Sequence, residues 1–198
     1  MFRAARRSLV WLLGLALGCE AVPGDDGDGS ADDGGDDASP DDDVPPVAFC
    51  EEVADWDPQW RALEARVLEI VNQHRAQGAS CGSAGQFGPT DPLQMDPALR
   101  CAARKHSMDM AERGYFEHVS PDGQEPWDRI EAAGYAFEAA GENIAGGSPD
   151  AEGTMAQWMG SDGHCSNIMN PGFTDIGVGY FPGGEFGTLW TQNFAAPL

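Results

Sequence analysis

The chain has 198 residues, a formal net charge of −22 and 41% hydrophobic residues. This acidity excludes nucleic acid as a partner and disfavours anionic membrane surfaces, because both repel a strongly negative protein. The N-terminal part differs in composition from the remaining residues, roughly 150, which are enough for one domain with its own hydrophobic core.

The N-terminus predicts export. Arg3, Arg6 and Arg7 precede an apolar run at residues 9–17, which is shorter than the roughly 20 residues of a membrane-spanning helix. Residues 1–18 are therefore expected to be a signal peptide. The run ends in LALGC, which resembles a bacterial lipobox and implies that Cys19 carries a lipid anchor, although Ala16 stands where leucine is usual. The alternative is an ordinary secretory signal with an incidental cysteine, and on both interpretations the domain is extracytoplasmic.

Residues 19–46 are expected to form a disordered acidic linker. Ten Asp lie between Gly24 and Val44, without a Lys or Arg among them. Such a segment cannot bury enough apolar surface to offset the conformational entropy lost on ordering, and its like charges extend it. A calcium-binding loop is the alternative, but the twelve-residue pattern with a closing Glu is missing.

Residues 47–198 are expected to form the globular domain, with helices in its first part. The spacing of Trp60, Leu63, Val67, Ile70 and Val71 predicts a helix that ends at Gly78. A second helix is expected to start at the capping pair of residues 96–97 and to stop near residue 114. Shorter helices are expected over residues 127–133 and 153–159.

Strands are expected mainly toward the C-terminus. Residues 176–181 and 188–194 flank a glycine-rich stretch at residues 182–187, which predicts an antiparallel hairpin. Residues 115–119 are a further candidate strand. Helices that are separated along the chain from an antiparallel sheet indicate a layered α+β domain.

Four of the five cysteines lie in this domain: Cys50, Cys81, Cys101 and Cys165. An even number in an exported chain predicts two disulfides. Three pairings are possible, of which we favour Cys50 with Cys101 and Cys81 with Cys165. A zinc site is the alternative, but the chain has no Cys-x-x-Cys pair. A catalytic Cys165 beside His164 would require an odd number of cysteines.

Histidines and tryptophans on predicted helix faces are expected to be structural. His74 and His106 lie on apolar faces, where a histidine is usually a hydrogen-bonded core residue. A carbohydrate groove is the alternative for the tryptophans, although their scattered positions favour the core: Trp56, Trp60, Trp127, Trp158 and Trp190.

Five motifs carry a family resemblance. They are YFEHVSPDG at residues 115–123, GENIA at 141–145, WMGSDGH at 158–164, GVG at 177–179 and WTQNF at 190–194. In this order they resemble the bacterial branch of the cysteine-rich secretory protein, antigen 5 and pathogenesis-related superfamily, also called CAP or SCP-like. The resemblance covers residues 68–195.

The resemblance implies an α-β-α sandwich with a central three- or four-stranded antiparallel sheet. It also implies a cleft with two histidines and two acids that binds a divalent cation such as Zn²⁺ in several members. His118, Glu142 and His164 match three of these positions, whereas Ser161 stands at the fourth. Two imidazoles and one carboxylate suit an open zinc site.

Three classes of function follow. The favoured one is a non-catalytic binding or interaction module whose cleft takes a small molecule, lipid, glycan, peptide or cation, since a fold does not fix a chemistry. The second is a metal-assisted, peptidase-like hydrolase, with Glu142 as general base; a serine mechanism through Ser161 is disfavoured because no nucleophile-elbow pattern surrounds it. The third is a purely structural surface protein.

Overall fold

The computed structural model describes residues 44–198. The predicted signal peptide, Cys19 and the predicted linker up to residue 43 lie outside the described residues. Within the described part, no helix is both long and apolar enough to cross a bilayer.

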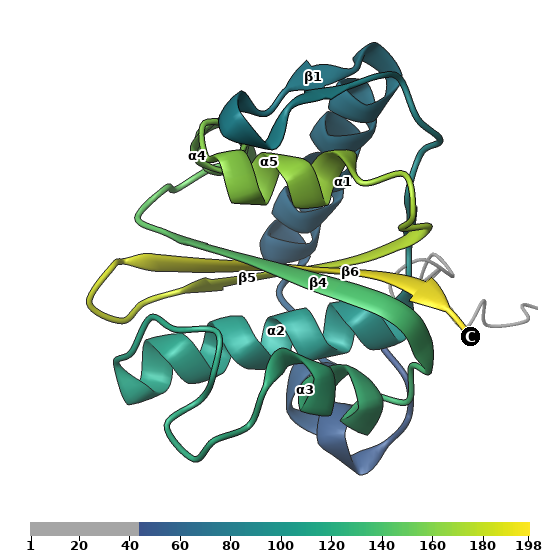
Figure 1. Cartoon of the computed structure of the whole chain (residues 1–198). Coiled ribbons are helices and arrows are strands. Elements are labelled where there is room, and N and C mark those ends of the chain that lie inside the picture. Colours follow the sequence, from purple (N-terminus) through teal and green to yellow (C-terminus); the bar gives the residue numbers. More distant parts are fainter. Residues whose placement is uncertain (1–43) are drawn as a thin grey trace, which may run out of the picture. The chain divides into compact units, whose positions relative to one another are not determined.

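The described residues form three layers (Figure 1). A central four-stranded sheet has the strand order β3-β5-β6-β4, formed by β3 (Gln94–Met95), β4 (Phe137–Gly146), β5 (Asp175–Pro182) and β6 (Thr188–Pro197). One face carries α1 (Pro58–Gln77), α4 (Ala151–Met159) and α5 (Asp162–Met169), and the other carries α2 (Pro97–Arg113), α3 (Pro126–Ala132) and η1 (Ala48–Val53). A small antiparallel pair, β1 (Ala79–Ser80) and β2 (Gln86–Phe87), flanks η2 (Gly82–Ala84). The predicted sandwich is thereby confirmed.

The helix boundaries follow from local capping. The side chain of Asp57 accepts a hydrogen bond from Gln59 N at the start of α1, and Asp96 accepts from two backbone N–H groups at the start of α2. Both helices have proline in their first turn, where the missing N–H costs no intrahelical bond. Gly114 ends α2 in the left-handed conformation, with φ of 67°. The capping pair at residues 96–97 and the stop near Gly114 were predicted from the sequence, whereas the cap at Asp57 was not.

Two glycines of β5 allow α2 to pack directly against the sheet. A Cβ on Gly177 would lie 2.0 Å from the carbonyl carbon of Leu99, and one on Gly179 would lie 2.3 Å from that of Ala103. No side chain can replace hydrogen at such distances. The GVG motif therefore sets the depth at which α2 lies on the sheet.

The two disulfides join the predicted partners. Cys50–Cys101 connects η1 to α2, and Cys81–Cys165 connects the segment after β1 to α5. The favoured pairing is confirmed.

Three details differ from the sequence expectations. Residues 115–119 form a loop instead of a strand, because the chain reverses after Gly114 and the N–H of Tyr115 returns to the carbonyl of Met110. The sequence did not indicate β4 or α5, and both carry residues of the predicted site. The sheet is antiparallel except for β3, which pairs in parallel with β5.

Candidate functional site

The candidate site is centred on Glu142 in β4. This strand lies at the edge of the sheet and pairs with β6, so that Glu142 is opposite Asn193. The Glu142 side chain is only 2% exposed. A carboxylate buried this far needs hydrogen-bond partners or a counter-charge.

Three side chains supply those partners. Nδ1 of His118, in the loop after α2, lies 2.8 Å from Oε1 of Glu142. Arg129 of α3 donates from Nη2 to Oε2 at 2.9 Å. Asn193, with its amide nitrogen turned toward the carboxylate, donates to Oε2 at 3.1 Å. Both carboxylate oxygens are therefore engaged.

The electrostatics agree with a charged carboxylate. Burial raises the pKa of Glu142, but the hydrogen bond from His118 and the charge of Arg129 outweigh it, and the pKa is lowered. The same hydrogen bond raises the pKa of His118. Because the His118 side chain is 47% exposed, it is the part of the network that a ligand can reach.

His106 supports this network from α2. Its side chain is fully buried, and Nε2 donates to the backbone oxygen of Glu117 at 3.1 Å. The same nitrogen lies 3.8 Å from Oε1 of Glu142. Burial lowers the pKa of His106 to about 4, so the imidazole is neutral at physiological pH. The expected structural role is confirmed, but the sequence did not indicate that His106 lies against the site.

His164 lies on α5 and contributes to a different part of the cleft. Burial and the nearby positive charge of His118 lower its pKa. The backbone oxygen of His164 accepts from Asn143, and no hydrogen bond between its imidazole and Glu142 is found among residues 44–198. Ser161 precedes α5 as its N-cap residue, and within the same range no hydrogen bond joins it to the His164 side chain.

His118, Glu142 and His164 are not gathered around one point in the observed arrangement. Among the described residues, no three His, Cys, Asp or Glu side chains are grouped as a metal ion would require. Glu142 is engaged with His118 and Arg129, so that metal ligation by Glu142 would need one of these contacts to open.

Two open pockets lie along β4. The first, of about 430 Å³, is lined by His118, Trp127 and the strand residues 140–142. The second, of about 350 Å³, is lined by His164, Phe116, Phe186 and the strand residues 144–146. In Figure 1, β4 lies in front of its sheet partners with α5 on one side and α3 on the other. The pockets therefore share one strand as their floor.

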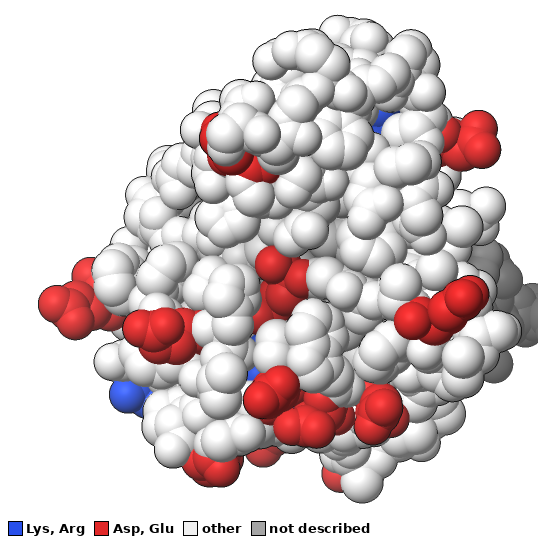
Figure 2. Space-filling view, in the orientation of Figure 1, with Lys and Arg blue, Asp and Glu red and all other residues white. Residues whose placement is uncertain are grey.

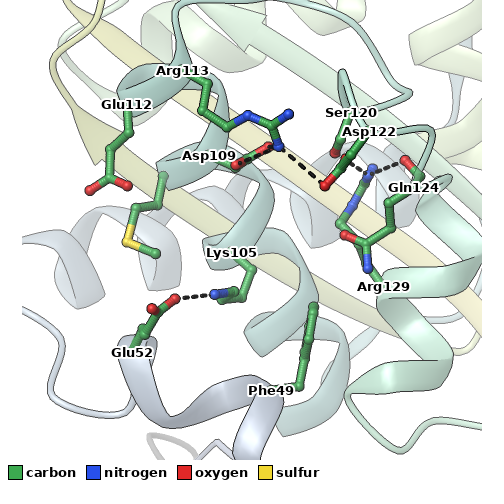
Figure 3. A pocket seen from close by; sticks show the side chains of 11 residues that line it. Phe49, Glu52, Lys105, Asp109, Glu112, Arg113, Ser120, Asp122, Gln124 and Arg129 are labelled. Carbon is green, nitrogen blue, oxygen red and sulfur yellow. Dashed lines mark hydrogen bonds and ion pairs between the residues drawn. The ribbon is translucent and has the colours of Figure 1, made fainter.

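Arg129 connects the cleft to a smaller pocket of about 190 Å³ at the side of α2 (Figure 3). There its Nη1 donates to Gln124 O and Ser120 Oγ, while Nη2 donates to Glu142 and to His118 O. The other basic groups of this pocket are also paired: Lys105 with Glu52, and Arg113 with Asp109 and Asp122. The pocket thus holds Arg129 in position and leaves it no excess positive charge for an anion.

Several residues of the cleft were missed or differently assigned by sequence. Arg129, Phe116 and Phe186 were not singled out, although Phe116 lies in a recognised motif. Asn193 also lies in a motif. It is opposite Glu142 in the pairing of β4 with β6, a relationship that the sequence did not reveal because β4 was not predicted. Trp158 and Trp190 are buried as expected, whereas Trp127 is 39% exposed and faces the cleft.

The comparisons with known proteins agree with this architecture. Residues 68–194 match the cysteine-rich secretory protein family, CAP. A Bacillus subtilis relative, the uncharacterized protein YkwD, is 42% identical over 133 residues, which is 67% of this chain and 47% of YkwD. The chain thus spans about half the length of this relative.

Solved structures show the same fold. An extracellular protein containing an SCP domain from Bacillus anthracis is 28% identical, with a TM-score of 0.59 over 70% of this chain and 43% of that one. An outer surface protein from Borrelia burgdorferi gives a TM-score of 0.55 at 17% identity, over 70% of this chain and 92% of that one.

Proposed function

Since the chain belongs to the cysteine-rich secretory protein family, we propose that it is an exported, lipid-anchored binding module of the bacterial cell envelope. Its cleft along β4 takes a ligand without chemically changing it. Anchoring rests on the sequence around Cys19, and an extracytoplasmic location agrees with the extracellular relative from Bacillus anthracis.

One observation carries the non-catalytic assignment. The carboxylate of Glu142, the acid in the GENIA motif, is 2% exposed and already paired with Arg129. A general base must reach the proton that it removes, directly or through one water molecule. A carboxylate that is buried and neutralised by a guanidinium is poorly placed for this role, whereas His118 and the two pockets remain accessible to a ligand.

An apolar fluorescent probe tests whether the cleft binds. Nile red fluorescence should increase when the dye is added to the full chain, because exposed Trp127 and Phe186 offer it apolar contact. Trp127→Ser and Phe186→Ser should each reduce the increase. Leu198→Ser, at an apolar position that is 87% exposed, is the matched control. An equal response in all four proteins would reject the cleft as the binding site.

The second candidate is a cation-dependent site. We propose Zn²⁺ as the ion and His118, Glu142 and His164 as its ligands, because imidazole and carboxylate groups suit zinc. Binding would require Glu142 to give up a present partner. Such an ion would also open the alternative of a metal-assisted, peptidase-like hydrolase.

Calorimetric titration of the full chain with Zn²⁺ tests this candidate. Stoichiometric binding that His118→Ala and His164→Ala abolish, and that His74→Ala leaves unchanged, would support the cation site. If the heat of Zn²⁺ binding persists in His118→Ala and His164→Ala, the ion binds at another place on the protein. Cleavage of a peptide substrate only in the presence of Zn²⁺ would then favour the hydrolase over the binding module.

A further inference from the structure

The spacing of the two pockets defines a length for the ligand. The strand residues that line them are centred on Gly141 and Ala145, which are four positions apart in β4. A strand rises about 3.3 Å per residue, so these two strand positions are about 13 Å apart. Side chains at positions i and i+4 of an extended peptide have the same separation and lie on the same side of its backbone.

Both pockets have apolar walls suited to side chains. Phe116 and Phe186 face each other in the second pocket, with ring centroids 5.1 Å apart, and Phe186 is 45% exposed. In the first pocket Trp127 is 39% exposed and Val119 is 45% exposed. Large apolar groups that lie exposed around a groove mark a binding surface. Each pocket would bury one apolar side chain of the ligand.

The contacts of β4 indicate how such a peptide would be held. Asn167 donates to the backbone oxygen of Glu142 at 3.4 Å, and Trp158 donates to that of Ile144 at 3.1 Å. These edge carbonyls are therefore already engaged. A ligand would lie over the strand and be recognised by its side chains instead of adding a strand to the sheet.

Charge selects the ligand further. Glu125 lines the first pocket, and Figure 2 shows many Asp and Glu side chains but few Lys or Arg on this face. No Lys or Arg is among the described residues that line either pocket. Residues 44–198 carry 22 Asp and Glu against 8 Lys and Arg, so that the field of the domain attracts cations.

We propose that the cleft binds an extended cationic peptide segment with apolar side chains four positions apart. One apolar side chain enters the pocket of Trp127 and the other enters the pocket of Phe186, while basic residues of the peptide face Glu125 and the acidic surface around the cleft. This inference rests on the proposed binding function and specifies its ligand.

The test uses labelled peptides and the full chain. The probe has nine residues, with Phe at its third position, Leu at its seventh and Lys elsewhere. In two control peptides Leu is moved one position closer or farther, and in a third control Glu replaces Lys. Fluorescence anisotropy at low and high salt measures binding.

The probe should bind about tenfold more tightly than either control with shifted Leu, because burial of one apolar side chain is worth about one factor of ten or more. Trp127→Ser and Phe186→Ser should each weaken binding about tenfold, and Leu198→Ser should not. Salt should weaken binding, and the Glu peptide should not bind. The probe should be recovered uncut.

The failures are distinguishable. Equal affinity for all three Lys peptides would show that charge attraction alone causes binding. It would overturn the proposed spacing of four positions between the two apolar side chains. No peptide binding by a chain that still binds Nile red would overturn the ligand while the binding module stands. If a chito-oligosaccharide binds to the wild type but not to the Trp127→Ser and Phe186→Ser variants, the ligand of the cleft would be a glycan instead of a peptide. Loss of the Nile red response as well would overturn both proposals.

Discussion

His118 and Glu142, 24 residues apart in the chain, are joined by a hydrogen bond of 2.8 Å between Nδ1 and Oε1. The bond fixes the imidazole with Nδ1 toward the buried carboxylate. The half-exposed ring is thus held at the cleft in one orientation, while Arg129 balances the charge of Glu142 from behind.

The pKa values of the two histidines beside Glu142 should be shifted in opposite directions from the ordinary value near 6.5. Contact with Glu142 raises the pKa of His118, whereas burial lowers that of His106 to about 4. An NMR titration of the imidazole nitrogens in the full chain with chelator measures both. Glu142→Gln should lower the pKa of His118, and an unchanged value would contradict the contact.

These shifts also predict how stability depends on pH. Between about pH 6.5 and 4 the unfolded state protonates His106 and the folded state does not, so the free energy of unfolding should fall by up to about 3 kcal/mol as the pH decreases. The contribution of His118 has the opposite sign: it is complete below about pH 6.5 and is lost as the pH rises through the raised folded pKa. Urea denaturation of wild type and His106→Gln at several pH values separates the two.

The buried ion pair between Glu64 and Arg104 should be costly to break. Nη2 of Arg104 lies 2.6 Å from Oε2 of Glu64, and both side chains are at most 1% exposed. Arg104→Met should destabilise by about 3–5 kcal/mol, because it leaves Glu64 buried without its counter-charge. The double variant Glu64→Leu, Arg104→Met should be less destabilised, as measured by urea denaturation.

Arg66 provides the control for this prediction. It forms exposed pairs with Glu69 and Glu152, so that Arg66→Met should barely move the denaturation midpoint. A loss as large as that of Arg104→Met would show that burial is not the cause.

A methyl group at Gly177 should disrupt the contact between α2 and β5. Its Cβ would lie 2.0 Å from backbone of α2, so Gly177→Ala should cost about 3 kcal/mol or more through overpacking. Gly163→Ala is the matched control, since nothing lies within 4 Å of its Cβ position. Thermal unfolding compares the two variants, and equal melting temperatures would be inconsistent with the close packing.

Reduction should destabilise the domain. The disulfides close sequence separations of 51 and 84 residues, and each native bridge typically contributes about 2–4 kcal/mol. The melting temperature should fall in reductant and in Cys50→Ala and Cys81→Ala. Cys19→Ser should leave the melting temperature unchanged. If reductant does not lower the melting temperature of the wild type, the result would argue against both disulfides.

The helices were predictable where local signals agree. The caps at Asp57 and Asp96, the prolines that follow them and the helical apolar spacing all act within a few residues. The hairpin of β5 and β6 was predictable for the same reason. By contrast, β4 has the sequence FEAAGENIAG, rich in residues with low strand propensity. It becomes a strand by pairing with β6, which is a non-local contact.

The acidic charge, the even number of cysteines in the domain and the five family motifs could be read from the sequence. The motifs singled out His118, Glu142 and His164. Which of these side chains are in contact depends on the folded arrangement. In the fold, His118 hydrogen-bonds Glu142, Arg129 and His106 lie against the same carboxylate, and His164 lines a second pocket with Phe186. The physical reason is that a buried charge must find its partners among residues far apart in the chain, and only the packing of α2, α3 and α5 around β4 selects them.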